Sequence, residues 1–114
     1  VWFGGTLTAR MLRRVTELGD GWIPIMDATT DDVREGAARI AAAASRPIDV
    51  QSRATTVMGN DGKPDAVATI RGIPALLDAG VTDVTVYLAA FAPTLADSPA
   101  ALKTLGAAFR EVTA

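Results

Sequence analysis

The stretch VWFGGTLTARMLRRVTELGDGWIPI, residues 1–25, determines the fold class of this chain. Residues 1–3 are apolar and predict a short strand buried on both faces, as in a parallel sheet. The pair Gly4-Gly5 then leads into a helical pattern, and a second apolar run follows at residues 22–25. Strand, glycine turn, helix, tight turn and strand make up a βα unit with the start of the next one.

The same alternation of strand and helix continues along the rest of the chain and predicts four βα units. The expected strands are residues 1–3, 22–25, 48–58 and 81–88, and the expected helices lie between Thr8 and Gly19, between Thr29 and Pro47, over residues 66–79, and from Ser98 onward. Alternating strands and helices imply a parallel sheet with right-handed crossovers. An open doubly wound sheet and a section of a (β/α)8 barrel both satisfy this pattern, and four units are half of a complete barrel.

Helix ends are marked by residues with specific backbone roles. Thr6 or Thr8 is expected to cap the first helix, and Thr29 or Thr30 the second. Glycines at positions 19 and 80 are expected to end the first and third helices, while Gly72 and Pro74 predict a kink or break within the third. Each expected helix has an apolar face with helical spacing. From the first helix to the fourth, these faces are Met11, Leu12, Val15 and Leu18; Val33, Ala37, Ile40, Ala41 and Ala44; Val67, Ile70, Ile73, Leu76 and Leu77; and Ala101, Leu102, Leu105, Phe109 and Val112.

Composition excludes several classes of function. The length of 114 residues suits one domain, and a hydrophobic content of 49% is enough for a core. Lys and Arg total 11 against 13 Asp and Glu, a net charge of -2, which argues against a nucleic-acid or anionic-membrane surface. The chain contains no Cys and no His, so it has neither thiolate nor imidazole for catalysis or for holding a metal.

No apolar run approaches the length of about eighteen residues that a membrane helix needs. The chain opens at Val1, inside an apolar strand and without a signal peptide, and we therefore expect a fragment of a longer protein. The composition, rich in Ala and free of Cys, is typical of a cytoplasmic enzyme.

The glycine turn is the first candidate site. Gly4 and Gly5 allow a ligand to approach the backbone closely, and the helix start behind them offers N–H donors to an anion. The hydroxyl groups of Thr6 and Thr8 can add hydrogen bonds to phosphate oxygens. An ordinary βα turn followed by a capped helix explains the same residues, and the residues by themselves leave both interpretations open.

A family resemblance adds to this interpretation. The segment Trp-Phe-Gly-Gly at residues 2–5, the pair Arg13-Arg14 and the run Leu-Gly-Asp-Gly-Trp-Ile-Pro at residues 18–24 resemble the luciferase-like monooxygenase family. The likeness is greatest to the branch that uses the deazaflavin coenzyme F420, found in actinobacteria. The junction at residues 78–81 is also similar to the family's approach to its last strand, so the resemblance extends over essentially the whole chain.

The resemblance implies that this chain is the C-terminal half of a (β/α)8 barrel, residues 1–114 forming a single half-barrel domain. The whole protein would transfer a hydride between F420, or alternatively flavin mononucleotide (FMN), and a small organic substrate. Gly4, Gly5, Thr6 and Thr8 would hold the cofactor phosphate. The family's ring pocket and catalytic groups belong to the missing first half, so no catalytic residue is expected here and the isolated chain should be inactive.

Two other interpretations remain. The chain can be a stand-alone half-barrel module that binds a phosphorylated ligand without turnover, or a truncated or proteolytic fragment with no role of its own. A half-barrel has open sheet edges and an apolar inner face. Its expected partners are therefore the missing N-terminal half or a second copy of itself, besides the cofactor and substrate.

Asp20, Trp22 and Arg53 are also considered as site residues. Asp20 is expected to fix its turn or to pair with Arg13 or Arg14, and Trp22 is expected to pack. Arg53 can either pair with a carboxylate or reach a ligand phosphate.

Residues at the carboxyl ends of the expected strands would surround the mouth of a barrel. These are residues 25–27, 56–60 and 87–90, among which Asp27 and Tyr87 are candidate substrate contacts.

Overall fold

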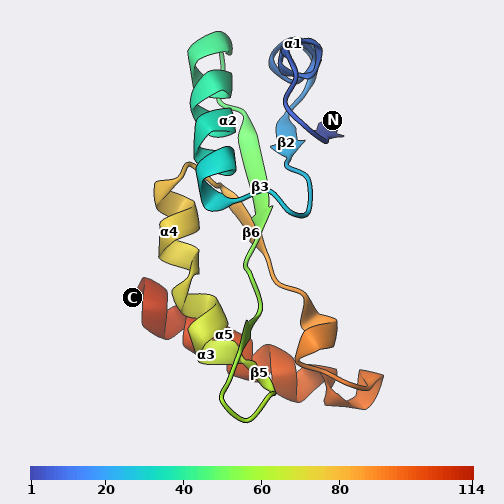
Figure 1. Cartoon of the computed structure of the whole chain (residues 1–114), viewed down its shortest axis with the longest axis vertical. Helices are drawn as coiled ribbons and strands as arrows, with labels where there is room; N and C mark the ends of the chain where they lie inside the picture. Colours follow the sequence, from blue (N-terminus) through green and yellow to red (C-terminus); the bar gives the residue numbers. More distant parts are fainter. The chain divides into compact units, whose positions relative to one another are not determined.

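The computed structural model describes residues 1–114, the whole chain (Figure 1). Its contacts group into two compact units. The first contains Val1–Ser52 and Ala75–Val84, and the second contains Arg53–Pro74 and Thr85–Ala114. The single half-barrel domain expected over residues 1–114 stays a prediction.

The first unit is built on a parallel sheet. Its strands are β1 (Trp2–Gly4), β2 (Gly21–Ile23), β3 (Asp49–Arg53) and β6 (Asp83–Thr85), and their order in the sheet is β1-β2-β3-β6. Phe3 lies opposite Trp22, which in turn lies opposite Val50. The predicted α/β class with a parallel four-stranded sheet is therefore confirmed.

Strand order equal to chain order has a consequence for the helices. Because every right-handed crossover then moves in the same direction, successive helices lie on one face of the sheet. The helices α1 (Ala9–Leu18) and α2 (Thr30–Ala43) do contact each other. This arrangement is compatible with a half-barrel, in which all helices lie outside the strands.

Trp22 is at the centre of the first unit. Its side chain is only 4% exposed, and its ring lies so close to Gly36 of α2 that a Cβ there would be 2.5 Å from the ring. Val15 of α1 and Val33 and Ile40 of α2 are also buried. The helix-covered face of the sheet therefore carries the core.

Two apolar residues of the first unit are more exposed than expected. The first strand is not buried on both faces, since Trp2 is exposed and lies over Gly21 on the face away from Trp22. Leu18 is also exposed, because its helix packs through Val15 and ends at that position.

The helix starts follow the sequence pattern. Thr8 caps α1, its hydroxyl oxygen accepting the Met11 N–H at 3.1 Å. Thr29 caps α2 through a capping box with Asp32. The Asp32 N–H donates to the Thr29 hydroxyl oxygen at 3.1 Å, and the Thr29 N–H donates to the Asp32 carboxylate at 3.0 Å. Of the two threonines proposed for each cap, the structure selects one.

Gly19 differs from the expectation. It ends α1 in an extended conformation (φ -97°), not in the left-handed conformation of a C′ glycine. Glycine is needed there for space, because a Cβ would lie 2.9 Å from the Val15 carbonyl oxygen and 3.0 Å from the Phe3 ring.

Arg46 completes the end of α1. Its guanidinium donates to the Thr16 carbonyl at 2.7 Å and to the Gly19 carbonyl. Carbonyls in the last turn of a helix have no intrahelical partner and carry the negative end of the helix dipole. Arg46 is therefore a structural residue that ties the segment after α2 to the end of α1.

We expect Arg46→Ala to lower the free energy of unfolding by about 1–2 kcal/mol, because two charge-assisted hydrogen bonds are lost. Urea denaturation followed by circular dichroism measures this loss. Arg34→Ala is the matched control, since Arg34 forms only an exposed ion pair with Asp31, worth less than about 0.5 kcal/mol. Equal losses in the two variants would contradict the capping role of Arg46.

The second unit begins where the expected third strand is interrupted. Instead of a strand over residues 48–58, β3 ends at Arg53, and β4 (Val57–Met58) pairs antiparallel with β5 (Pro64–Asp65). The turn between them is closed by the Gly59 N–H, which donates to the Lys63 carbonyl at 2.7 Å. Residues 59–63 thus form the tip of a small hairpin.

The expected fourth strand, residues 81–88, is also shorter than predicted. Only Asp83–Thr85 pairs in the sheet, and a short 3-10 helix, η1 (Leu88–Ala90), follows. A second one, η2 (Leu95–Asp97), precedes α5 (Ser98–Thr113), whose predicted start at Ser98 is confirmed.

The helix predicted over residues 66–79 is two helices, α3 (Ala66–Arg71) and α4 (Ile73–Asp78). The break falls at Gly72, just before Pro74, as predicted. Gly80 follows α4 with φ +100°, the left-handed conformation expected of a glycine that ends a helix.

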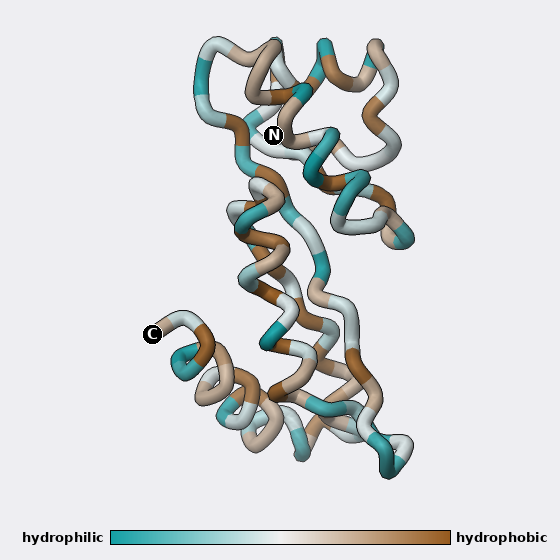
Figure 2. Tube along the Cα trace, turned by 60° about the vertical axis from the view of Figure 1, so that its left-hand side comes forward, coloured by the Kyte–Doolittle hydropathy of each residue, from teal (hydrophilic) through white to brown (hydrophobic).

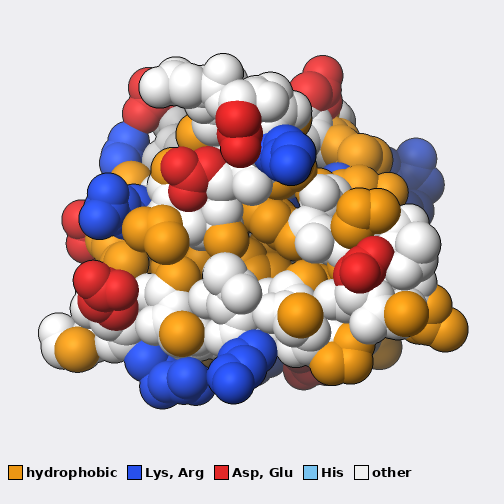
Figure 3. All heavy atoms as spheres, turned by 90° about the horizontal axis from the view of Figure 1, so that it is seen from below, with side chains coloured by type: hydrophobic (Ala, Val, Ile, Leu, Met, Phe, Trp, Pro, Cys, Tyr) orange, Lys and Arg blue, Asp and Glu red, His pale blue; other side chains and the backbone are white.

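In the second unit α3 packs against α5. Ile70 of α3 and Ala101, Leu105 and Ala108 of α5 are buried there. Figure 2 shows hydrophobic residues recurring along the helix that ends at the C-terminus, and in Figure 3 hydrophobic side chains reach the surface between charged ones. Besides Leu18, five residues that the sequence assigned to buried helix faces are exposed in one unit or the other: Ala41, Val67, Leu77, Leu102 and Phe109.

Candidate functional site

The glycine turn lies at the carboxyl end of β1, in the first unit. Gly4 pairs with Ile23 in the sheet, and the Gly5 N–H donates to the Ile23 carbonyl at 3.0 Å. Gly5 has φ +124°, a backbone conformation that residues other than glycine rarely adopt. The turn therefore needs glycine at position 5, but the Gly5 N–H is used within the protein.

The Trp22 side chain is hydrogen-bonded to the turn. Its indole Nε1–H donates to the Gly5 carbonyl at 3.0 Å. The Gly5 N–H and carbonyl are thus both bonded to β2, so Gly5 is fixed on both sides. The sequence predicted that Trp22 packs, but not this hydrogen bond.

Free backbone donors follow immediately after Gly5. The N–H groups of Thr6 and Leu7 donate to no protein atom, whereas the Thr8 N–H donates to the Thr6 carbonyl at 2.9 Å. The Thr8 side-chain oxygen is occupied as an acceptor by Met11. Of the four predicted site residues, Thr6 therefore offers the free N–H, while Gly4, Gly5 and Thr8 shape the turn.

A pocket of about 300 Å³ adjoins this turn. Its walls are the turn itself, the end of β2 and one side of α2. Its charged residues are Asp32, Glu35 and Arg39. Asp32 caps α2, and Arg39 donates to the Leu7 carbonyl at 2.7 Å. Glu35 is exposed and forms no ion pair.

These charged residues were missed at the sequence level. Asp32, Glu35 and Arg39 follow the spacing i, i+3, i+7, which places side chains on one side of a helix. That spacing was a usable signal. What the spacing could not reveal is that this side of α2 faces the glycine turn, since the contact joins residues far apart in the sequence.

Asp20 has a different partner from those expected. Instead of Arg13 or Arg14, the Val1 ammonium pairs with the Asp20 carboxylate, and both groups are exposed. The hydrogen bond and the charge of this ammonium lower the pKa of Asp20 below its ordinary value, with a smaller contribution from Arg46. Asp20 precedes β2 at the amino end of the sheet and lines neither of the two pockets of the first unit beside the sheet.

The other candidates at the carboxyl ends of the expected strands do not lie together in one site. Ile25 lines the pocket beside the glycine turn, whereas Asp27 is exposed and lies outside it. Residues 56–60 include β4 and the start of its turn. In the second unit the Arg53 guanidinium carbon lies 5.4 Å from the centre of the Tyr87 ring. The structure thus brings together two of the predicted candidates, Arg53 and Tyr87.

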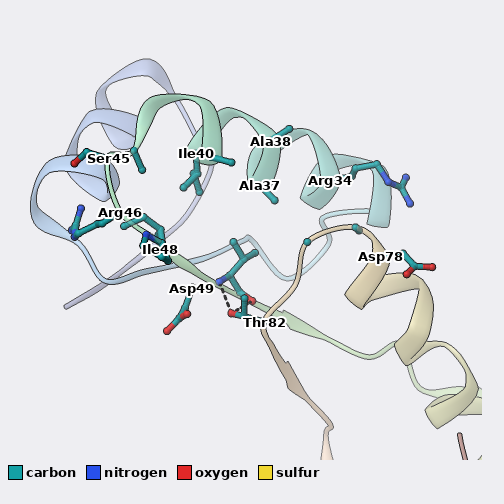
Figure 4. A pocket seen from close by; sticks show the side chains of 16 residues that line it. Arg34, Ala37, Ala38, Ile40, Ser45, Arg46, Ile48, Asp49, Asp78 and Thr82 are labelled. Carbon is teal, nitrogen blue, oxygen red and sulfur yellow. Dashed lines mark hydrogen bonds between the residues drawn. The ribbon is translucent and has the colours of Figure 1, made fainter. Parts of the chain in front are cut away.

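A larger pocket of about 670 Å³ lies on the other side of α2 (Figure 4). Its α2 wall is rich in alanine, and the Thr82 hydroxyl on the opposite side accepts the Val50 N–H at 2.9 Å. The Thr82 hydroxyl is thus used in joining the segment before β6 to β3. The pocket also lies at the amino ends of β3 and β6, where residues of α/β proteins contribute to stability more than to function.

Comparison with known proteins identifies no relative: no family profile, no curated protein and no solved structure matches this chain. The structure also contains no group of three or more acidic side chains that could hold a metal ion. None of its helices has both the length and the apolar character required to cross a membrane.

Proposed function

We propose that this chain is the C-terminal half of a luciferase-like (β/α)8 barrel, an oxidoreductase that transfers a hydride between F420 and a small organic substrate. FMN is the alternative cofactor. In this proposal the turn at Gly4, Gly5, Thr6 and Thr8 holds the phosphate end of the cofactor. The reacting ring lies against the other half of the barrel, and the protein acts in the cytoplasm.

The observation that carries the proposal is the pair of free N–H groups at Thr6 and Leu7, beside a pocket at the carboxyl end of the sheet. Ligands of parallel α/β proteins bind at that end. Free N–H donors ahead of a helix favour an anion. The order of the strands, with α1 and α2 in contact, also supports a section of a barrel over a doubly wound sheet.

The charge pattern of α1 supports the same ligand class. The first turn of α2 contains Asp31 and Asp32, which complement the positive end of its dipole. The first turn of α1 contains no acidic residue and includes Arg10. A bound phosphate would supply the negative charge that α1 itself lacks.

Glu35 opposes an anion in this pocket, because its carboxylate has no positive partner to neutralise it. We expect Glu35→Gln to tighten the binding of a phosphate-bearing ligand by about threefold, as one like charge is removed. Isothermal titration with FMN measures this change. Glu17→Gln, an exposed change on α1 outside the pocket, is the control and should leave affinity unchanged. Weaker binding in Glu35→Gln would contradict an anionic ligand.

A second candidate function is that of a half-barrel module that binds a phosphorylated ligand without turnover. The observation in its favour is that the residues lining the pocket beside the glycine turn all come from the first unit. Titration with F420, with FMN and with simple phosphate esters separates the two proposals. Binding stronger to F420 than to FMN supports the oxidoreductase branch, whereas binding of simple phosphate esters with no preference for either cofactor favours the module.

A further inference from the structure

Arg53 and Tyr87 form a pair on the exposed side of the second unit. The guanidinium lies over the ring at 5.4 Å from its centre, within the distance at which a cation is attracted to an aromatic face. Tyr87 is the only tyrosine in the chain. The contact restrains the long Arg53 side chain, which would otherwise move freely in solvent.

The backbone fixes this pair in place. The Ala54 N–H donates to the Thr85 carbonyl at 2.9 Å, joining the end of β3 to the end of β6. Ala54 is 2% exposed, and successive side chains of an extended chain point to opposite sides. Arg53 therefore points away from the core, as does Tyr87, which is exposed.

The donors of Arg53 are unused. Arg34 pairs with Asp31, while Arg39 and Arg46 donate to backbone carbonyls. The Arg53 side chain forms no hydrogen bond and no ion pair, so no carboxylate neutralises it. A cation–π contact uses none of the N–H donors of the guanidinium in a hydrogen bond. The planar fork of these donors matches the geometry of two oxygens of a phosphate or carboxylate.

We propose that Arg53, held by Tyr87, is a binding site for the oxyanion group of a small phosphorylated or carboxylated molecule. The site belongs to the second unit and does not depend on the function proposed for the glycine turn. Arg53 supplies the charge and the paired donors, and Tyr87 positions the guanidinium.

Titration of the isotopically labelled protein with inorganic phosphate, and separately with acetate, tests this site by nuclear magnetic resonance. Saturable shifts are expected at the Arg53 side chain and at the amides of Ala54 and Tyr87. We expect Arg53→Gln to weaken phosphate binding at these resonances by about tenfold, since a charge-assisted pair of hydrogen bonds is lost. Tyr87→Leu should weaken binding by about threefold, because the guanidinium is no longer held in place.

Arg71→Gln is the matched control, because Arg71 is an exposed arginine of the same unit without an ion pair. Arg53→Lys keeps the charge but loses the planar fork, so it should bind phosphate less tightly than the unaltered protein. Saturable shifts with acetate alone would assign a carboxylate ligand, and shifts with phosphate alone a phosphate ligand. Absence of shifts with both anions, or equal loss of binding in Arg53→Gln and Arg71→Gln, would overturn the proposal.

Discussion

Replacing Trp22 by alanine should lower the free energy of unfolding by about 3–5 kcal/mol, the range found when a buried aromatic ring is removed from a core. Trp22 is 4% exposed and packs against Gly36 of α2, where no side chain is available to fill the space left by the ring. The substitution also leaves the Gly5 carbonyl without its donor. Urea denaturation followed by far-ultraviolet circular dichroism measures the loss without relying on tryptophan fluorescence.

Trp22→Phe separates the two contributions of this residue. Phenylalanine keeps an aromatic ring against α2 but has no indole N–H, so we expect a smaller loss of about 1–2 kcal/mol. The backbone amides after Gly5 should then exchange with solvent faster, since the turn has lost one of its two anchors. A loss below about 1 kcal/mol for Trp22→Ala would contradict the central position of this side chain.

The second large effect concerns ligand binding. We expect Gly5→Asp to weaken the binding of a phosphate-bearing cofactor by about a hundredfold, because a carboxylate beside the bound phosphate adds like-charge repulsion. The change also forces a side chain into a conformation with φ +124°, which costs about 1–3 kcal/mol of stability. Fluorescence titration with F420 and with FMN measures the affinity.

Gly5→Asn is the matched control, because asparagine has the shape of aspartate without its charge. Both variants share the backbone strain, so a difference in affinity between them reports charge alone. Asparagine should lose no more than about fivefold in affinity. Equal affinity of the two variants, or an affinity of Gly5→Asp equal to that of the unaltered protein, would remove the glycine turn from the phosphate site.

Features set by local chemistry were predictable from the sequence. Proline at position 74 lacks an N–H, so the break between α3 and α4 follows from that residue and Gly72. The capping role of Thr29 follows from the acidic residue three positions later. Alternation of strands and helices was enough to predict a parallel sheet, because the connections themselves restrict how the strands can be arranged.

Features set by distant contacts were not predictable. Residues 57–58 have the composition of a continuing strand, and only their pairing with residues 64–65 turns them into a hairpin. Gly19 has the composition of an ordinary C′ glycine, but the nearby Phe3 ring and the Val15 carbonyl explain why a glycine is required. Leu102 matches the apolar spacing of α5, but the helix packs through Leu105 instead.

The candidate site also combines features that depend on local sequence with features that depend on distant contacts. The glycine turn was visible because glycine pairs at strand ends have a specific backbone role. Arg39 and Glu35 were not identified, since nothing local to α2 indicates that this part of the helix lies beside the turn. The pairing of Arg53 with Tyr87 likewise depends on the approach of β3 and β6.

The most direct test of the phosphate site compares two ligands that differ only in phosphate. The amide resonances of Thr6 and Leu7 are followed while the protein is titrated first with FMN and then with riboflavin, which is the same flavin without the phosphate. F420 and its deazaflavin core, which lacks both the phosphate and the tail joined to it, form a second, less strictly matched pair. We predict that the phosphorylated ligands shift both amides in a saturable way and that the phosphate-free ligands do not. Equal shifts with both members of each pair, or no shift at Thr6 and Leu7 with any of them, would contradict the account.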